Sequence, residues 1–249
     1  MPQADNKMEL EESYLSRLYT SQPSTLPEDI KSYVLNPKNA DNEILYLEKY
    51  VNVKNPDLSK IIFITEVLGK CLRRHSEFRD YMKLLVELME RYNDYPHSIF
   101  CLRIIKSISG SKFYTPLSFY ILRILRNAIS VKNLTASGRS IDYDMLNPDM
   151  ERCKSEEHQM FVIEEAGSLL LKHMSMFSKN IGFPELASVV INELKKLRTG
   201  IYKEVIGKMI FDINEQREYV LEKRNKLKLN GIDGKAISLF ESSIERTIR

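Results

Sequence analysis

Seven basic side chains and no acidic ones occupy residues 95–141 of this 249-residue chain, a stretch called here the basic window. They are Arg103, Lys106, Lys112, Arg123, Arg126, Lys132 and Arg139. Lysine and arginine bind the phosphate backbone of nucleic acids, because each contact releases condensed counterions. The residue types therefore indicate phosphate binding. A solvated helix face with a bias toward positive charge is the alternative.

Spacing within the basic window predicts where these charges lie. Arg103 and Lys106 are three residues apart, and so are Arg123 and Arg126. Residues three apart share one side of an α-helix, so each pair should mark one edge of its helix. If the two helices are antiparallel neighbours, the four charges join into one patch with Lys112 at the turn. We take these five residues as candidate RNA-facing residues.

The residue patterns of common catalytic sites do not occur. The chain has no phosphate-binding glycine loop, no HExxH motif and no pair of CxxC motifs. Its four histidines are isolated. The carboxylates of Glu164 and Glu165 are adjacent and point to different helix faces, whereas acid–base catalysis needs two groups that converge on a substrate. We therefore expect a protein that is not an enzyme, without a cofactor, metal or small-molecule substrate.

Apolar residues at helical spacing predict helices along most of the chain, and no segment alternates as a half-buried strand does. The segment 55–57 (Asn-Pro-Asp) is a helix start signal, and Asp41 is a plausible N-cap. The last helix should follow Asp233-Gly234 and end at Arg249. We predict an all-α fold of at least nine helices, stacked as an irregular HEAT/armadillo-like helical-repeat solenoid. An irregular helical bundle is the alternative.

Composition and loop signals define the broad organisation. Hydrophobic residues make up 43% and charged residues 29% of the chain, values typical of an ordered soluble protein, and the net charge is +3. No apolar run approaches the roughly 20 residues that a membrane span needs. We expect no membrane contact, and free thiols at the three cysteines. Residues 1–132 should form N-terminal helical repeats, 133–154 a loop, and 155–249 C-terminal repeats.

A second informative segment covers residues 181–224, which read as two amphipathic helices. Pro184 suits a first helical turn, and Glu185 lies at the positive end of the helix dipole. Phe183 and Leu186 should be buried. The second helix turns polar and basic near its end, so residues 216–224 should be its exposed edge, with Arg217 and Arg224 as candidate partner-binding residues. Ordinary packing between repeats is the alternative for this helix pair.

The same segment resembles the C-terminal region of the nucleolar complex protein 2 family. The resemblance lies in the start Phe183-Pro184-Glu185-Leu186, a helix that ends near Leu-Lys-Lys, a tyrosine in the link, and a closing Val-x-x-x-Arg. A second match begins at Tyr95-Pro96 and continues to residues 113–119, which resemble the aromatic-Pro-Leu-x-Phe helix start of the family. Both matches stand in the order of the family, and the chain would be a short member.

The resemblance implies a nuclear, nucleolar protein without enzymatic activity. It would be a scaffold in the assembly, maturation or nuclear export of the large (60S) ribosomal subunit. The implied partners are nucleolar complex proteins 1 and 3, proteins of pre-60S particles, and precursor rRNA. A helical-repeat adaptor that binds protein partners unrelated to ribosomes is the alternative from the residues alone.

Overall fold

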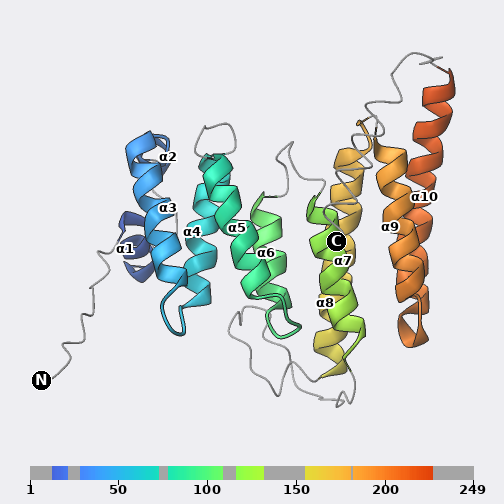
Figure 1. Cartoon of the computed structure of the whole chain (residues 1–249), viewed down its shortest axis with the longest axis horizontal. Coiled ribbons are helices and arrows are strands. Elements are labelled where there is room, and N and C mark those ends of the chain that lie inside the picture. Colours follow the sequence, from blue (N-terminus) through green and yellow to red (C-terminus); the bar gives the residue numbers. More distant parts are fainter. Residues whose placement is uncertain are drawn as a thin grey trace, which may run out of the picture. The chain divides into compact units, whose positions relative to one another are not determined.

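The computed structural model describes residues 13–21, 29–72, 78–108, 116–131, 155–180 and 182–226. Within these ranges the chain forms α-helices, one short 3-10 helix (η2) and no β-strand. In chain order they are α1 (Tyr14–Ser21), α2 (Asp29–Val34), α3 (Pro37–Val51), α4 (Leu58–Cys71), α5 (Phe78–Arg91), α6 (Ser98–Ile108), α7 (Pro116–Ile129), α8 (Glu156–Phe177), α9 (Phe183–Leu197), η2 (Gly200–Tyr202) and α10 (Lys203–Lys226) (Figure 1). The predicted all-α class is confirmed for this part of the chain. The HEAT/armadillo-like solenoid stays a prediction.

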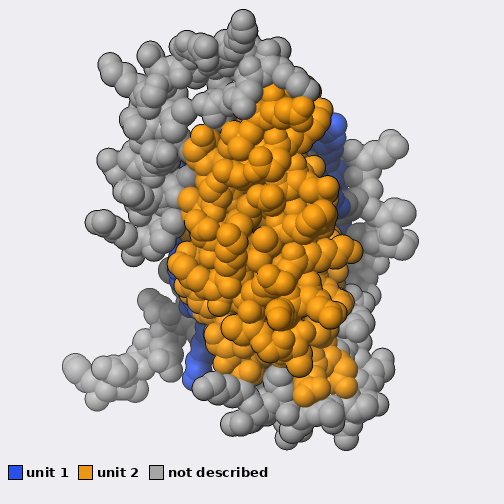
Figure 2. Space-filling model, turned by 90° about the vertical axis from the view of Figure 1, so that its right-hand side faces the viewer, with its two compact units in different colours: residues 1–92 blue, residues 93–249 orange. Residues whose placement is uncertain are grey.

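Contacts between residues divide the chain into two compact units, residues 1–92 (unit 1) and residues 93–249 (unit 2) (Figure 2). Unit 1 contains α1 to α5, and unit 2 contains α6 to α10. The predicted loop at 133–154 and the predicted last helix after Gly234 lie outside the described residues. The domain division expected at that loop therefore stays a prediction.

A buried glutamate of α3 organises unit 1. Glu43 is 1% exposed, and its Oε1 accepts hydrogen bonds from the backbone N–H of Tyr14 and from the Tyr33 hydroxyl, both at 3.0 Å. The Tyr14 amide opens α1 and has no partner within that helix, so the carboxylate satisfies it and complements the helix dipole. Burial, with the charge of Glu43, raises the pKa of Tyr33 to about 12, which keeps the phenol a donor. Glu43 thereby joins α1, α2 and α3.

Two helix starts in unit 1 show how capping sets boundaries. Asn36 caps α3 by accepting a hydrogen bond from the backbone N–H of Lys38 at 3.1 Å, and Pro37 is the first helical residue. The predicted cap, Asp41, is wrong, because it is an exposed residue inside the helix. A capping side chain followed by proline is the stronger signal. Asp57, in the predicted start segment, accepts from two backbone amides of the first turn of α4.

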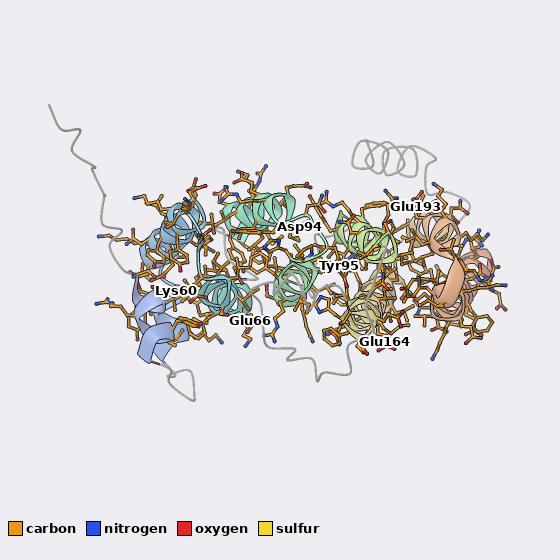
Figure 3. All side chains as sticks on the ribbon, turned by 90° about the horizontal axis from the view of Figure 1, so that it is seen from below. Lys60, Glu66, Asp94, Tyr95, Glu164 and Glu193 are labelled. Atoms are coloured by element: carbon orange, nitrogen blue, oxygen red, sulfur yellow. The ribbon has the colours of Figure 1, made fainter. Side chains whose placement is uncertain are left out.

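Unit 2 arranges its helices in two layers (Figure 3). One layer contains α6, α8 and α10, and the other contains α7 and α9. Consecutive helices run in opposite directions, so α7 pairs with α8, and α9 pairs with α10 (Figure 1). α8 and α10 approach closely at Gly167, where an added Cβ would lie 1.9 Å from Cε of Met209. A larger residue at position 167 would have to displace this methionine.

Buried hydrogen bonds fasten the ends of these helices together. Gln159 of α8 is 1% exposed, and its side-chain amide donates to the backbone carbonyl of Ala128 in α7 at 2.6 Å. The Tyr202 hydroxyl of η2 donates to the Gln159 side-chain carbonyl. Burial raises the pKa of Tyr202, so this phenol remains a donor at neutral pH. One glutamine therefore links both layers and the connection between α9 and α10.

Replacement of Phe183 by alanine should cost about 3–5 kcal/mol in the free energy of unfolding. Phe183 is 0% exposed at the start of α9, so its removal leaves a cavity among residues that cannot fully collapse. Denaturant unfolding of the full chain measures the loss. The control is Met176→Ala, which truncates a side chain that is 41% exposed and should change stability by no more than about 0.5 kcal/mol. Equal losses in both variants would contradict the burial.

Candidate interaction surfaces

Helices α6 and α7 carry four cations of the basic window, with their apolar stripes buried and these basic residues on the remaining sides. Lys106 and Arg126 are exposed, whereas Arg103 and Arg123 are half-buried. Lys112 lies outside the described residues. Because α6 belongs to one layer and α7 to the other, the Arg103/Lys106 pair and the Arg123/Arg126 pair are carried by different layers.

Acidic residues from later helices lie beside two of these cations. Nη2 of Arg126 is 2.9 Å from Oε2 of Glu193 in α9, and Nζ of Lys106 is 3.9 Å from Oε2 of Glu165 in α8. Figure 3 shows Glu193 on the side of α7 and α9, and Glu164, the neighbour of Glu165, at the opposite side of unit 2. Lys106 and Arg126 are thus paired with acids of opposite layers. The single four-charge patch stays a prediction.

Arg123, another cation of the basic window, contacts an aromatic ring. The guanidinium carbon of Arg123 lies 4.8 Å from the centre of the Tyr120 ring, one helical turn earlier in α7. This cation–π contact holds a basic group next to an aromatic ring. Proteins that bind single-stranded nucleic acid combine these two groups, because bases stack on aromatic rings and cations attract phosphates. The pair Tyr120–Arg123 is therefore chemically suited to RNA, although the sequence argument considered only charge.

The surface ion pairs leave these cations available to a phosphate. In the Lys106–Glu165 pair the side chains are 67% and 47% exposed, and exposed pairs contribute only about 0–1 kcal/mol. In the Arg126–Glu193 pair the arginine side chain is 57% exposed and the glutamate side chain is 18% exposed. A polyanion that brings several phosphates can therefore displace such an acid. Glu165 and Glu193 still lower the local positive potential. A count of charges over residues 95–141 does not include these two glutamates. They belong to later helices, which packing places next to α6 and α7.

The segment that starts α9 is part of the core. Phe183 and Leu186 are 0% exposed, and Pro184 is also buried. Glu185 is half-buried and lies in the first turn, where its charge complements the helix dipole. The expectation that Phe183 and Leu186 are buried is confirmed. In this structure these residues contribute packing and a helix start.

Arg217 has a packing role as well as a charge. Its Nε donates to Oγ of Ser188 in α9 at 2.8 Å, and the Ser188 hydroxyl donates to the backbone carbonyl of Pro184 at 2.8 Å. Arg217 also pairs with its neighbour Glu218. The expectation that residues 216–224 form an exposed edge is therefore wrong for Gln216 and Arg217, which are half-buried because they lie on the side of α10 near α9. The side chain of Arg224 lies outside the described part of the structure.

Titratable groups elsewhere in the described ranges do not gather into a site. No three His, Cys, Asp or Glu residues of this part could hold a metal ion together. His158 is 6% exposed at the start of α8, with its ring edge-on to Tyr95 at 5.6 Å. Burial lowers the pKa of His158, so the ring stays neutral near pH 7 and packs as part of the core. No described helix has the length and apolarity to cross a membrane.

The sequence analysis did not predict that three large side chains just before and within α10 are exposed. Ile201, Phe211 and Tyr219 are 68%, 62% and 62% exposed. Phe211 follows the aliphatic stripe of α10 directly in sequence, so it reads as a continuation of the core. A helical projection from Ile206 and Ile213, both fully buried, places Phe211 on the outer side instead.

Comparison with models of protein families gives a match. The model of the Noc2p family matches residues 82–248, about two thirds of the chain, which includes α6 to α10. No curated protein matches the chain, and no solved structure matches it. The matched region begins within α5 and contains both segments that carry the sequence resemblance. Since the match covers well over half of the residues, the chain belongs to the Noc2p family, the family of nucleolar complex protein 2.

Proposed function

We propose that this protein is a non-enzymatic scaffold in the assembly, maturation or nuclear export of the large (60S) ribosomal subunit. The match of residues 82–248 to the Noc2p family carries the proposal, because membership implies a nucleolar role in ribosome biogenesis. The matched region contains nearly all of unit 2, so the helices that carry the basic window are family helices. Sister nucleolar complex proteins 1 and 3, pre-60S proteins and precursor rRNA are the proposed partners.

The physical features of unit 2 support a scaffold. Its helices bury apolar stripes in two layers, and the connection at Gln159 fastens three elements, so the surface groups stand on a firm support. Basic side chains on α6 and α7 lie on that support beside an aromatic ring. Such a surface can hold partners in a fixed arrangement, which is what assembly requires. Contact with RNA by these side chains is part of the proposal.

Gradient sedimentation of a cell lysate tests the proposed function. The tagged full-length chain should migrate with pre-60S particles and remain there at moderate salt. Mass spectrometry of the proteins purified with the tagged chain from those fractions should recover the sister nucleolar complex proteins. A protein found only in the light fractions, without ribosomal precursors, would contradict the proposal.

Charge reversal at Arg103, Lys106, Arg123 and Arg126 should weaken association with ribosomal precursors while the fold persists. Each cation that contacts a phosphate adds about one to the slope of log affinity against log salt, so the variant should also show a shallower salt dependence. Changes at exposed positions usually alter stability by no more than about 0.5 kcal/mol, although half-buried Arg103 and Arg123 could cost more. Sedimentation and unfolding of the same preparation separate the two effects.

A matched control reverses four exposed lysines of unit 1: Lys38, Lys49, Lys54 and Lys83. One of them, Lys83, pairs with Asp80 at 2.7 Å, so the control also disturbs a surface ion pair. Net charge changes equally in both variants. If both variants lose co-sedimentation with pre-60S particles to the same extent, nonspecific charge accounts for the association. The basic window then has no particular role.

Charge reversal at Arg217 should lower the stability of the fold, whereas charge reversal at Arg224 should weaken partner binding. Arg217→Glu removes the donor to Ser188 and places a carboxylate beside Glu218, so it should lower the melting temperature by a few degrees, as a loss near 1 kcal/mol does in a chain of this size. Arg224→Glu should leave melting unchanged and loosen the complex with a sister nucleolar protein. Co-purification and thermal unfolding measure the two effects. Normal co-purification of a folded Arg224→Glu variant would remove this residue from the partner surface.

A further inference from the structure

One carboxylate joins a cation of α7 to a cation of α9. Oε2 of Glu193 lies 2.9 Å from Nη2 of Arg126, and Oε1 of the same residue lies 2.5 Å from Nζ of Lys196. Lys196 follows Glu193 by about one turn of α9, whereas Arg126 comes from α7, the other helix of this layer (Figure 3). Two positive side chains that are far apart in the sequence are thereby held side by side.

The two cations are more exposed than the carboxylate that joins them. The side chains of Arg126 and Lys196 are 57% and 68% exposed, whereas that of Glu193 is 18% exposed. A guanidinium has five N–H donors and an ammonium has three, so each ion pair uses only part of the hydrogen-bonding capacity of its cation. The remaining donors can bind another anion at the surface while Glu193 stays in place.

The surroundings of the pair favour the phosphates of RNA over an acidic protein segment. α7 contains no aspartate or glutamate, and the other acid of α9, Glu185, lies about two turns before Glu193. Arg123 precedes Arg126 by about one turn, and its guanidinium carbon is 4.8 Å from the centre of the Tyr120 ring. Cations beside an aromatic ring suit a polyanion whose bases can stack, and an acidic peptide has no such bases.

The α6–α8 side of unit 2 is less suited to phosphate. α8 carries four glutamates and a single lysine, Lys172. Arg103 and Lys106 of α6 therefore lie next to a helix of net negative charge, and Lys106 is already 3.9 Å from Oε2 of Glu165. Like charges repel, so these carboxylates weaken the attraction of a phosphate to α6.

We propose that Arg126 and Lys196, held together by Glu193, form a binding site for the phosphate backbone of RNA on the exposed side of α7 and α9. Arg103 and Lys106, which belong to the other layer, are not part of this site. Lys196 lies outside the basic window, and only packing places it beside Arg126. The inference rests on the proposed contact of the protein with precursor rRNA.

Two adjacent lysines of α9 provide a matched test. Lys195 and Lys196 are both exposed, but successive residues of an α-helix point about 100° apart, and Lys196 is the one paired with Glu193. Binding of a short fluorescent single-stranded RNA to the purified full-length chain is measured by anisotropy. Lys196→Gln should weaken binding about fivefold at about 0.1 M salt and lower the slope of log affinity against log salt by about 0.7, the contribution of one phosphate contact. Lys195→Gln, which removes the same charge, should bind as the native chain does.

Arg126→Gln should weaken RNA binding to the same extent as Lys196→Gln. A glutamine at either position can still donate a hydrogen bond to Glu193, so both variants should fold, and thermal unfolding verifies this. Unchanged RNA binding in either variant would overturn the inference. Equal weakening by Lys195→Gln would also overturn it, because positive charge anywhere on α9 would then suffice.

Two further results would exclude RNA as the ligand of this site. Polyglutamate that displaces the labelled RNA as effectively as unlabelled RNA of equal charge would assign the surface to an acidic protein segment. A native chain that does not bind the RNA would overturn the site outright. Co-sedimentation with pre-60S particles is measured separately, so the proposed function can hold when the site fails.

Discussion

Burial of α8 on several sides is the constraint on which the rest of unit 2 depends. This helix contacts α6, α7, α9 and α10, and it buries residues from His158 near its start to Met174 near its end. A helix with neighbours in both layers fixes the distance between those layers. Gly167 permits α10 to approach, and Gln159 joins the start of α8 to α7 and to η2. The surface positions of α6 and α7 follow from this central packing.

Local signals in the sequence predicted the helices well, because periodicity and caps depend on neighbouring residues. Phe183 was correctly placed in the core by its position before Pro184. The start of α3 was misplaced at Asp41, since two capping signals lay close together and the proline decided between them. The buried carboxylate of Glu43 could not be foreseen, because its partners Tyr14 and Tyr33 come from other helices.

The candidate surfaces were less predictable than the helices, because a surface depends on contacts between residues that are far apart in the sequence. A count of charges along the chain treats residues 95–141 as free of acids, yet packing brings Glu165 and Glu193 beside Lys106 and Arg126. Likewise, the basic character of Arg217 was evident, but its hydrogen bond to Ser188 depends on how α10 rotates against α9. A side chain can therefore bear charge and still act mainly within the fold. Prediction of a surface requires the neighbours of each helix.

The lengths of the connections in unit 2 also bear on the order of folding. α9 and α10 are separated by the five residues 198–202, whereas α7 and α8 are separated by the 26 residues 130–155. Closure of the longer connection costs about 1.5 kcal/mol more in chain entropy. Both helices of the shorter pair also leave the ribosome in close succession during synthesis. The α9–α10 pair therefore closes at a lower cost in chain entropy than the α7–α8 pair does.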